Sequence, residues 1–314
     1  MSKTKKQHYV PRSYLKQFAI PGTEQIAVFD KSTQAQRVNN IMDVAEGNRF
    51  YDYDIGEMLD KVSADKLDGI DANDIEAVKT VFDNLEETIG STVEPAYAKL
   101  LRKIISKASN LTPWEFQNTF FVDHEDKAQL SVCLAFQLIR TKKMRDFIKD
   151  ASSQVADLAE RAFPGFDVDH LHFSDKDIKR MHIENLLDME HINELASIIN
   201  NLTWMLGINS TDQLFYTSDA PIVMIPHTGD STMGVGLLSR GVEVVLPITP
   251  KLLLVMFDGD YHYNHINHDR WYIQLDRTDY IEYYNWYLSM FAHRCVFSST
   301  GDFDIVRKTT NAKL

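Results

Sequence analysis

Helical and strand-like patterns occupy separate stretches of this 314-residue chain, and that segregation limits the folds it can adopt. Strand-like stretches fill residues 1–70, apolar residues recur at helical spacing over 71–200, and strand-like stretches return over 201–314. Segregated elements of this kind predict an α+β fold. We expect short N-terminal strands, a central helical block, and a C-terminal antiparallel or mixed β-sheet with a late helix. No repeat, low-complexity tract or Gly/Ser linker separates the regions, so we expect one compact domain over 1–314.

The expected elements follow from periodicity, caps and breakers. The predicted helices cover 13–18, 73–107 with a break at Gly90 or Pro95, 112–145 with an interruption at 123–126, 151–163, 174–200 and 279–292. The predicted strands cover 25–30, 37–42, 48–53, 202–208, 214–217, 222–225, 233–238, 242–247, 252–257 and 295–298.

Composition excludes several classes of protein. A net charge of −12 argues against a protein that binds nucleic acid over its whole surface. No apolar run approaches the roughly 18 residues that span a bilayer, and the first 20 residues lack the apolar core of a secretory signal. Cys133 and Cys295 are too few for a disulfide framework or a Cys-rich zinc site. We therefore expect a cytoplasmic protein with no membrane contact.

The N-terminal run from His8 through Tyr9, Val10 and Pro11 to Arg12 is dense in chemically useful groups. It lies in a leader that carries five basic residues and no acidic residue before Glu24. Such a leader is either a solvated tail or a local contact for nucleic acid or another phosphate-containing ligand.

Polar residues also interrupt the apolar helices. Glu87 and Glu94 are seven positions apart and share a face if their helix is unbroken. Gln137 and Arg140 fall within or at the end of a mostly apolar run. Buried polar groups need partners, so these residues form either a structural ion pair or a cleft that holds an anion or a metal-bound water.

A strand-end turn, Thr217-Ser218-Asp219-Ala220-Pro221, offers another candidate. Its aspartate either accepts backbone N–H groups of the turn or serves as a metal ligand or general base.

Two groups of histidines, His262/His265/His268 and His170/His172, lack a strong zinc pattern. They are more simply explained as surface residues of polar loops. Dinucleotide, Walker A, nucleophile-elbow and HExxH motifs are absent.

The order of these motifs resembles the domain-of-unknown-function family numbered four-two-three-eight. The resemblance rests on the His8–Pro11 run with Tyr14, Leu15 and Phe18; Asn48–Tyr51; Gln137-x-x-Arg140-Thr141; Trp204–Asn209; Phe215–Pro221; Leu246–Pro250; and Asn285–Phe297. It covers nearly the whole chain and brings no established activity. Among the polar residues it selects His8, Glu87, Glu94, Gln137, Arg140 and Asp219. Ala220 departs from the asparagine that the family often has there.

Two functions are compatible with these residues. The first is a metal-dependent phosphodiesterase or nuclease-like hydrolase, in which the leader folds back so that distant residues converge on one pocket. In it, His8, Asp219 and Arg140 are catalytic; Tyr9, Arg12 and Gln137 bind substrate; and Glu87, Glu94 and Asp219 hold a divalent cation such as Mg²⁺ or Mn²⁺. The alternative is a non-catalytic binding or regulatory protein, such as a sensor or effector in a defence or stress locus, in which the same residues dock the leader onto the helices.

Overall fold

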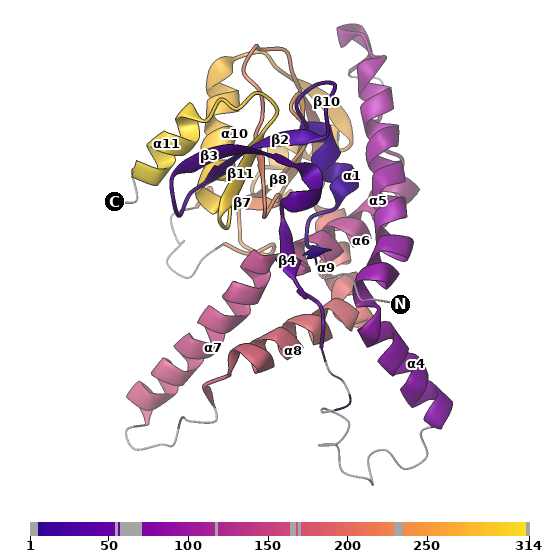
Figure 1. The fold of residues 1–314 in the computed structure, drawn as a ribbon. Coiled ribbons are helices and arrows are strands. Elements are labelled where there is room, and N and C mark those ends of the chain that lie inside the picture. The colour runs from indigo at the N-terminus through magenta and orange to yellow at the C-terminus, as the bar shows by residue number, and fades with distance from the viewer. Residues whose placement is uncertain are drawn as a thin grey trace.

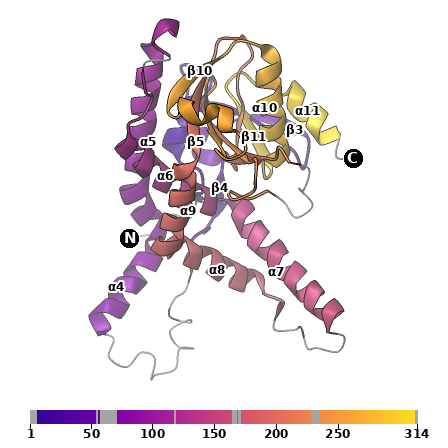
Figure 2. The same cartoon turned by 180° about the vertical axis from the view of Figure 1, so that it is seen from behind.

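The computed structural model describes residues 6–53, 56, 71–116, 119–163, 168, 171–228 and 235–311. The fold is α+β, as predicted (Figure 1). Figures 1 and 2 show the sheets gathered at one end, with α5 along one side and α10 and α11 on the other. Helices α4, α7 and α8 extend away from the sheets at the opposite end.

The elements are as follows. The N-terminal region contains β1 (Lys6–His8), α1 (Arg12–Leu15), η1 (Lys16–Phe18), β2 (Gln25–Asp30), β3 (Ala35–Asn40), η2 (Ile41–Asp43) and β4 (Glu46–Asn48). The helical block contains α4 (Ala72–Asp83), α5 (Leu85–Ser109), η3 (Pro113–Glu115), α6 (His124–Ile139), α7 (Lys142–Ala162), α8 (Asp175–Leu187) and α9 (Met189–Asn201). The C-terminal region contains β5 (Thr203–Asn209), β6 (Thr217–Ser218), β7 (Val223–Ile225), β8 (Glu243–Thr249), β9 (Leu252–Phe257), η6 (Tyr263–His268), β10 (Trp271–Leu275), α10 (Thr278–Phe291), β11 (Cys295–Ser298) and α11 (Asp304–Asn311).

The described strands form three sheets. A mixed sheet has the order β10-β5-β9-β8-β7, in which β10 runs parallel to β5 and the other pairs are antiparallel. An antiparallel sheet has the order β3-β2-β11-β6, so the N-terminal hairpin is completed by strands from the far end of the chain. β1 pairs with β4 in a small antiparallel ladder that places His8 opposite Glu46.

The core joins all three regions. One cluster of buried apolar side chains includes Tyr14 of α1, Leu101 of α5, Leu134 of α6 and Leu246 of β8. Every residue of β9 is buried, which explains its uninterrupted apolar sequence LLLVMF. The described part of the chain has no helix that is long and apolar enough to cross a membrane.

Several predicted boundaries are wrong for identifiable reasons. The first long helix breaks at Asn84 rather than at Gly90 or Pro95, because the Asn84 side chain donates to the Thr80 carbonyl at 3.0 Å and ends α4. The turn at Pro113 forms only η3, and α6 begins later, where Asp123 accepts the Asp126 N–H at 2.8 Å.

Further predicted helix and strand boundaries also differ from those of the structure. The helix predicted over 174–200 starts at the expected Ser174–Asp177 capping box but divides at Asp188, which caps α9. The strand predicted over 48–53 is wrong, since β4 ends at Asn48 and Arg49 adopts a left-handed φ of 48°. Residues 233 and 234 of a further predicted strand lie outside the described residues, and 235–238 are not extended into a ladder. β1, β10 and α11 were not predicted.

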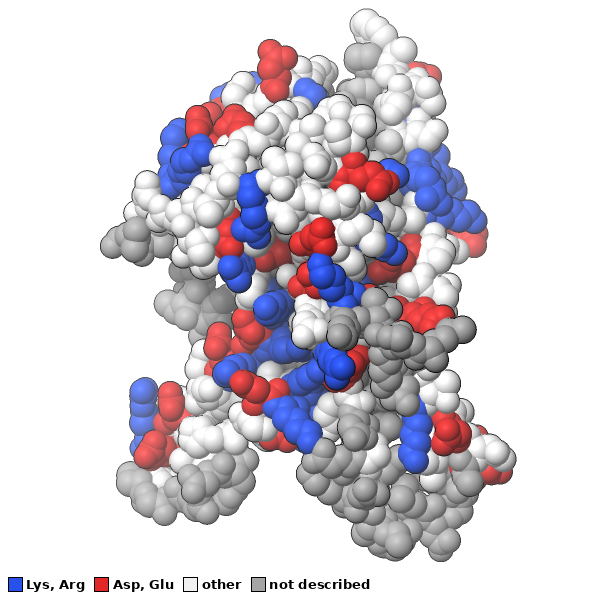
Figure 3. Space-filling model, in the orientation of Figure 1, with Lys and Arg blue, Asp and Glu red and all other residues white. Residues whose placement is uncertain are grey.

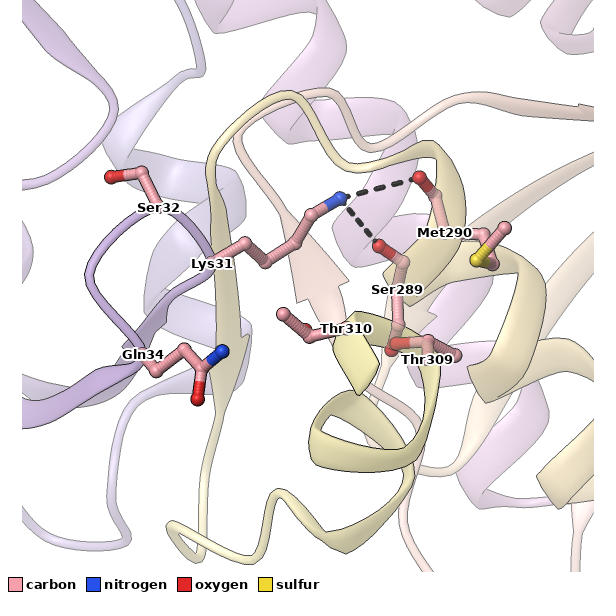
Figure 4. Close-up of a pocket in the computed structure, with 7 residues that line it drawn as sticks. All are labelled: Lys31, Ser32, Gln34, Ser289, Met290, Thr309 and Thr310. Atoms are coloured by element: carbon pink, nitrogen blue, oxygen red, sulfur yellow. Dashed lines mark hydrogen bonds between the residues drawn. The ribbon is translucent and has the colours of Figure 1, made fainter. Parts of the chain in front are cut away.

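Lys31, which follows β2, connects the two ends of the chain at the C-terminus of α10. Its ammonium donates to the main-chain oxygens of Ser289 at 2.8 Å and Met290 at 3.2 Å (Figure 4) and to that of Ala292 at 2.7 Å. The last carbonyls of a helix lack intrahelical partners and attract cations. Lys31, which lines the pocket drawn in Figure 4, therefore has a structural role as a cap on the C-terminus of α10.

Candidate functional site

Arg140, at the end of α6, holds the N-terminal strand in place. Its side chain is 2% exposed, and its Nη2 donates to the His8 main-chain oxygen at 2.7 Å and to Glu94 Oε1 at 2.9 Å. Its Nε donates to the Tyr51 hydroxyl at 3.3 Å, and that hydroxyl donates to the same His8 oxygen at 3.1 Å. The predicted role of Arg140 in holding a ligand gains no support, because the guanidinium is buried and serves these internal partners.

Gln137 and His8 are used in a similar way. The Gln137 amide donates to the Tyr9 main-chain oxygen at 3.1 Å. His8 Nε2 lies 3.1 Å from the Met42 carbonyl, so this nitrogen carries the proton and donates it. Burial and the nearby Arg12 lower the pKa of His8, which keeps its imidazole neutral. Both side chains anchor backbone, as the structural alternative expects.

The two glutamates predicted to act together, Glu87 and Glu94, have different surroundings in the structure. Glu94 pairs with Arg140, whereas Glu87 is exposed and has no part in this cluster. The carboxylate that meets the leader is that of Glu86, which accepts the His8 N–H at 3.2 Å. Arg12 is exposed, and its guanidinium contacts the Met42 sulfur at 2.7 Å.

Asp219 caps the start of β11. Its carboxylate accepts the main-chain N–H groups of His293 at 3.0 Å, Arg294 at 2.9 Å and Cys295 at 2.8 Å. Three N–H donors on one buried carboxylate satisfy most of its lone pairs. The N–H groups that Asp219 accepts thus belong to residues before and at the start of a neighbouring strand, and not to its own turn as predicted. These bonds occupy most of the oxygen sites that a metal ion would use.

His293 lies between two carboxylates. Its Nε2 is 2.6 Å from Asp146 of α7, and its Nδ1 is 3.8 Å from Asp219. Asp219 and, less strongly, Asp146 raise the pKa of His293 above its ordinary value. These carboxylates therefore favour the protonated form of His293.

These groups surround a pocket of about 170 Å³, which we call the Tyr9–Asp219 pocket. Its lining includes Tyr9, Val28, Arg37, Asp43, Val44, Ala45, Glu46, Lys142, Asp219, His293, Arg294, Cys295 and Phe297. It therefore brings together the residue after β1, strands β2 and β3, the start of β4, the start of α7 and β11. Of the predicted site residues, Tyr9 and Asp219 line it, whereas His8, Arg12, Glu87, Glu94, Gln137 and Arg140 do not.

The cations of the pocket differ in their partners. Arg294 forms an ion pair with Asp30, with Nη2 2.7 Å from Oδ2. Lys142 is exposed in the first turn of α7 and makes no ion pair within the described residues. Figure 3 shows basic and acidic side chains interleaved over the face where the four-stranded sheet meets α7. Lys142 and the first turn of α7 are the groups free to attract an anion, whereas His293 is already shared by Asp146 and Asp219.

Two other groups of the pocket keep their protons. Burial and the nearby Asp219 raise the pKa of Tyr9 far above neutral. The same two causes raise the pKa of Cys295 to about 12, so its thiol is not a ready nucleophile. The Tyr9 phenol is consequently a proton donor at this site.

The C-terminal histidines form a row without the geometry of a metal site. The ring centroids of His262 and His265 are 6.4 Å apart, as are those of His265 and His268. Across the described chain, no group of three or more His, Cys, Asp or Glu side chains is arranged to hold a metal ion. His170 lies outside the described residues, and His172 is exposed.

The order of motifs can now be compared with known families. A family model described as "Protein of unknown function (DUF4238)" matches residues 6–302. The chain belongs to this family. Neither the curated proteins nor the solved structures include a significant match. DUF4238 membership thus confirms the resemblance seen in the sequence.

Sequence reasoning missed His293, Lys142 and Asp146. His293 lies within the Asn285–Phe297 stretch, Lys142 directly follows the Arg140-Thr141 pair, and Asp146 lies one turn further along α7. The one sequence feature that could have indicated them is a charged or titratable side chain close to the end of a predicted helix or strand. No local pattern indicated that α7 and β11 meet.

Proposed function

We propose that this protein binds a small phosphate-containing ligand in the Tyr9–Asp219 pocket. The observation that carries the proposal is the position of Lys142 in the first turn of α7, facing a cavity that His293 also lines. A helix N-terminus and an ammonium both favour negative charge, and the oxygens of a phosphate group accept hydrogen bonds from both. The net charge of the whole chain is −12, so attraction of an anion here is local.

His293 gives this binding a pH dependence. Asp219 and Asp146 raise the pKa of His293, and the imidazolium, which attracts an anion, is present below that pKa. We expect affinity for phosphate to weaken as the pH rises through the pKa of His293.

The test is a calorimetric titration with inorganic phosphate at about pH 6 and about pH 8. Lys142→Gln should weaken binding about tenfold, the value of one charge-assisted hydrogen bond. Lys99→Gln, which changes an exposed lysine of α5, is the matched control. Equal binding by wild type and Lys142→Gln would contradict the proposal.

A second candidate is phosphoester hydrolysis, either as a phosphodiesterase or as a nuclease. The observation that favours it is the Tyr9 phenol in the wall of the pocket, since its hydroxyl can donate a hydrogen bond to a phosphate oxygen whose charge grows in the transition state. A divalent cation such as Mg²⁺ or Mn²⁺ remains part of this candidate. However, the structure does not bring its predicted ligands together: Asp219 accepts main-chain N–H groups, Glu94 pairs with Arg140, and Glu87 is exposed.

Cleavage of DNA, tRNA and simple phosphodiesters, with Mg²⁺, Mn²⁺ or chelator, tests the enzymatic candidate. A folded Tyr9→Phe variant should lose about 100-fold or more in rate if this hydrogen bond stabilises the transition state. Full activity in that variant would exclude this role for Tyr9.

Phosphate binding without any cleavage would favour the regulatory alternative, a ligand sensor or effector in a defence or stress locus. Both cysteines are free thiols, which is compatible with the cytoplasmic location that we propose.

A further inference from the structure

Three cationic side chains crowd together where the segment after β4 passes α7 and α8. Lys179 Nζ donates to the Arg49 main-chain oxygen at 2.8 Å, and Arg145 Nη2 donates to the Phe50 main-chain oxygen at 2.8 Å. Two cations thus hold consecutive carbonyl groups, and the side chain of a third, Arg49, extends from the same turn.

Arg145 is a half-buried cation whose hydrogen-bond and ring-stacking partners are neutral. Its guanidinium stacks on Phe50, with Cζ 3.7 Å from the ring centroid, and its Nη2 lies 3.1 Å from His182 Nδ1. Its Nε is buried and has no hydrogen-bond partner in the described structure. Burial lowers the pKa of Arg145 to about 10, which reports an environment that leaves this charge incompletely compensated.

The three cations also repel one another. Burial is the main cause that lowers the pKa of Lys179, and the charges of Arg145 and Arg49 add to it. Like charges held close together raise the free energy of the folded state unless a counter-charge joins them.

The nearby carboxylates are already engaged. Asp52 lies 4.0 Å from Arg49 Nε, and its Oδ1 accepts a hydrogen bond from Gln7 at 2.7 Å. Asp146, which faces Arg145, is bound to His293 at 2.6 Å. Figure 3 shows Lys and Arg side chains on this face, between the sheets and helices α7 and α8, with Asp and Glu side chains among them.

We propose that Arg49, Arg145 and Lys179 form a second binding site, which takes the phosphate group of a ligand. Guanidinium groups present paired donors that match phosphate oxygens, and the Lys179 ammonium adds a mobile donor. Arg49 is exposed and Lys179 half-buried, so both can reach a ligand, while Arg145 supplies a fixed charge behind them. The site shares no residue with the Tyr9–Asp219 pocket, so it does not depend on the function proposed for that pocket.

The test measures thermal unfolding in phosphate against chloride at equal ionic strength, in the Lys142→Gln background that disables the pocket. This background protein should still be stabilised by phosphate. Adding Arg49→Gln and Lys179→Gln should raise the phosphate concentration needed for a given shift in Tm by about tenfold or more. Adding Lys99→Gln instead should not. A background protein without a phosphate response, or an unchanged response in the triple variant, would overturn the proposal.

Stability in chloride separates this role from a structural one. Lys179 also anchors the Arg49 carbonyl, so Arg49→Gln alone, in the Lys142→Gln background, isolates the effect of charge. It should leave Tm in chloride unchanged or higher and still weaken the phosphate response, whereas removing a structural anchor should lower Tm. A lower Tm with an intact phosphate response would overturn the proposal. A fluorescent single-stranded oligonucleotide, titrated against the same variants, distinguishes the source of the phosphate. If oligonucleotide binding weakens in the triple variant, the ligand of this site is a nucleic-acid backbone. If the protein responds only to inorganic phosphate, the ligand is a small phosphate-containing molecule.

Discussion

The Arg140 guanidinium donates a 2.7 Å hydrogen bond to the main-chain oxygen of His8, across 132 residues of sequence. The sequence suggested that His8 and Arg140 act together as catalytic residues. In the structure they do meet, but the Arg140 side chain anchors the main chain of His8. The same guanidinium pairs with Glu94, so one buried cation joins α5, α6 and β1. The cluster positions Tyr9, the next residue, in the wall of the pocket.

Replacing Arg140 by Met should reduce the free energy of unfolding by about 3–5 kcal/mol, because Glu94 and the His8 carbonyl lose a buried partner. Urea denaturation measures the loss. Arg102→Met, at an exposed position of α5, should change stability by no more than about 0.5 kcal/mol. A similarly small effect at Arg140 would refute the anchoring role.

Tyr14→Phe tests the contact between α1 and the sheets. The Tyr14 hydroxyl is buried, 2.6 Å from Thr217 Oγ1 and 2.7 Å from the Pro247 carbonyl. Removing it leaves two buried partners unsatisfied, so we expect a loss of about 1–3 kcal/mol in denaturant unfolding. Tyr280→Phe, at an exposed tyrosine, is the control, and equal stability of the two variants would contradict the expectation.

Asp219→Asn should lower the pKa of His293 measured by NMR titration, because Asp219 is the largest cause of its upward shift. Asp146→Asn should lower it less, and Asp175→Asn should leave it unchanged. A larger effect from Asp146→Asn than from Asp219→Asn would show that the 2.6 Å contact dominates instead.

The pH dependence of stability should carry a signature of His182. Burial, assisted by Arg145, lowers the pKa of His182 to about 3, against about 6.5 in the unfolded chain. Because this pKa is lower in the folded protein, the folded state favours the neutral imidazole and the unfolded chain takes up the proton more readily. This contribution to stability is therefore present above about pH 6.5 and is lost as the pH falls toward 3, by about 1.4 kcal/mol per pH unit.

His182→Gln should thus flatten the decline in stability between about pH 7 and about pH 5, measured by denaturant unfolding. His172→Gln, at an exposed histidine, should keep the wild-type slope. An unchanged slope in His182→Gln would contradict the assignment.

Residues 1–314 should unfold as one cooperative unit, because one apolar cluster draws on the N-terminal segment, the helical block and the mixed sheet. Far-ultraviolet circular dichroism and tryptophan fluorescence should give coincident transitions in urea. Two separated transitions would divide the chain into domains.

Local signals predicted much of the fold. The bounds of β2 and β11 match the prediction, since each is an apolar or β-branched run between polar turns. The Ser174–Asp177 capping box marked the start of α8 because its hydrogen bonds lie within four residues. β1 escaped prediction, because the sequence KQH has no apolar pattern and is extended only through its pairing with β4.

The candidate site was predictable only in part. Tyr9 and Asp219 were selected and do line one pocket, but the other selected residues hold backbone or face solvent. The reason is that polar residues of a buried helix face have the same sequence pattern whether they bind a ligand or a carbonyl group. His293 and Lys142 depend on how α7 meets β11, which is a tertiary contact without a local signal.

The most direct measurement is an anomalous-difference map from crystals of the protein soaked in tungstate, a heavy-atom analogue of phosphate. The account predicts a tungstate ion in the Tyr9–Asp219 pocket, beside Lys142 and His293. Tungstate bound only elsewhere on the molecule, with this pocket empty, would contradict it.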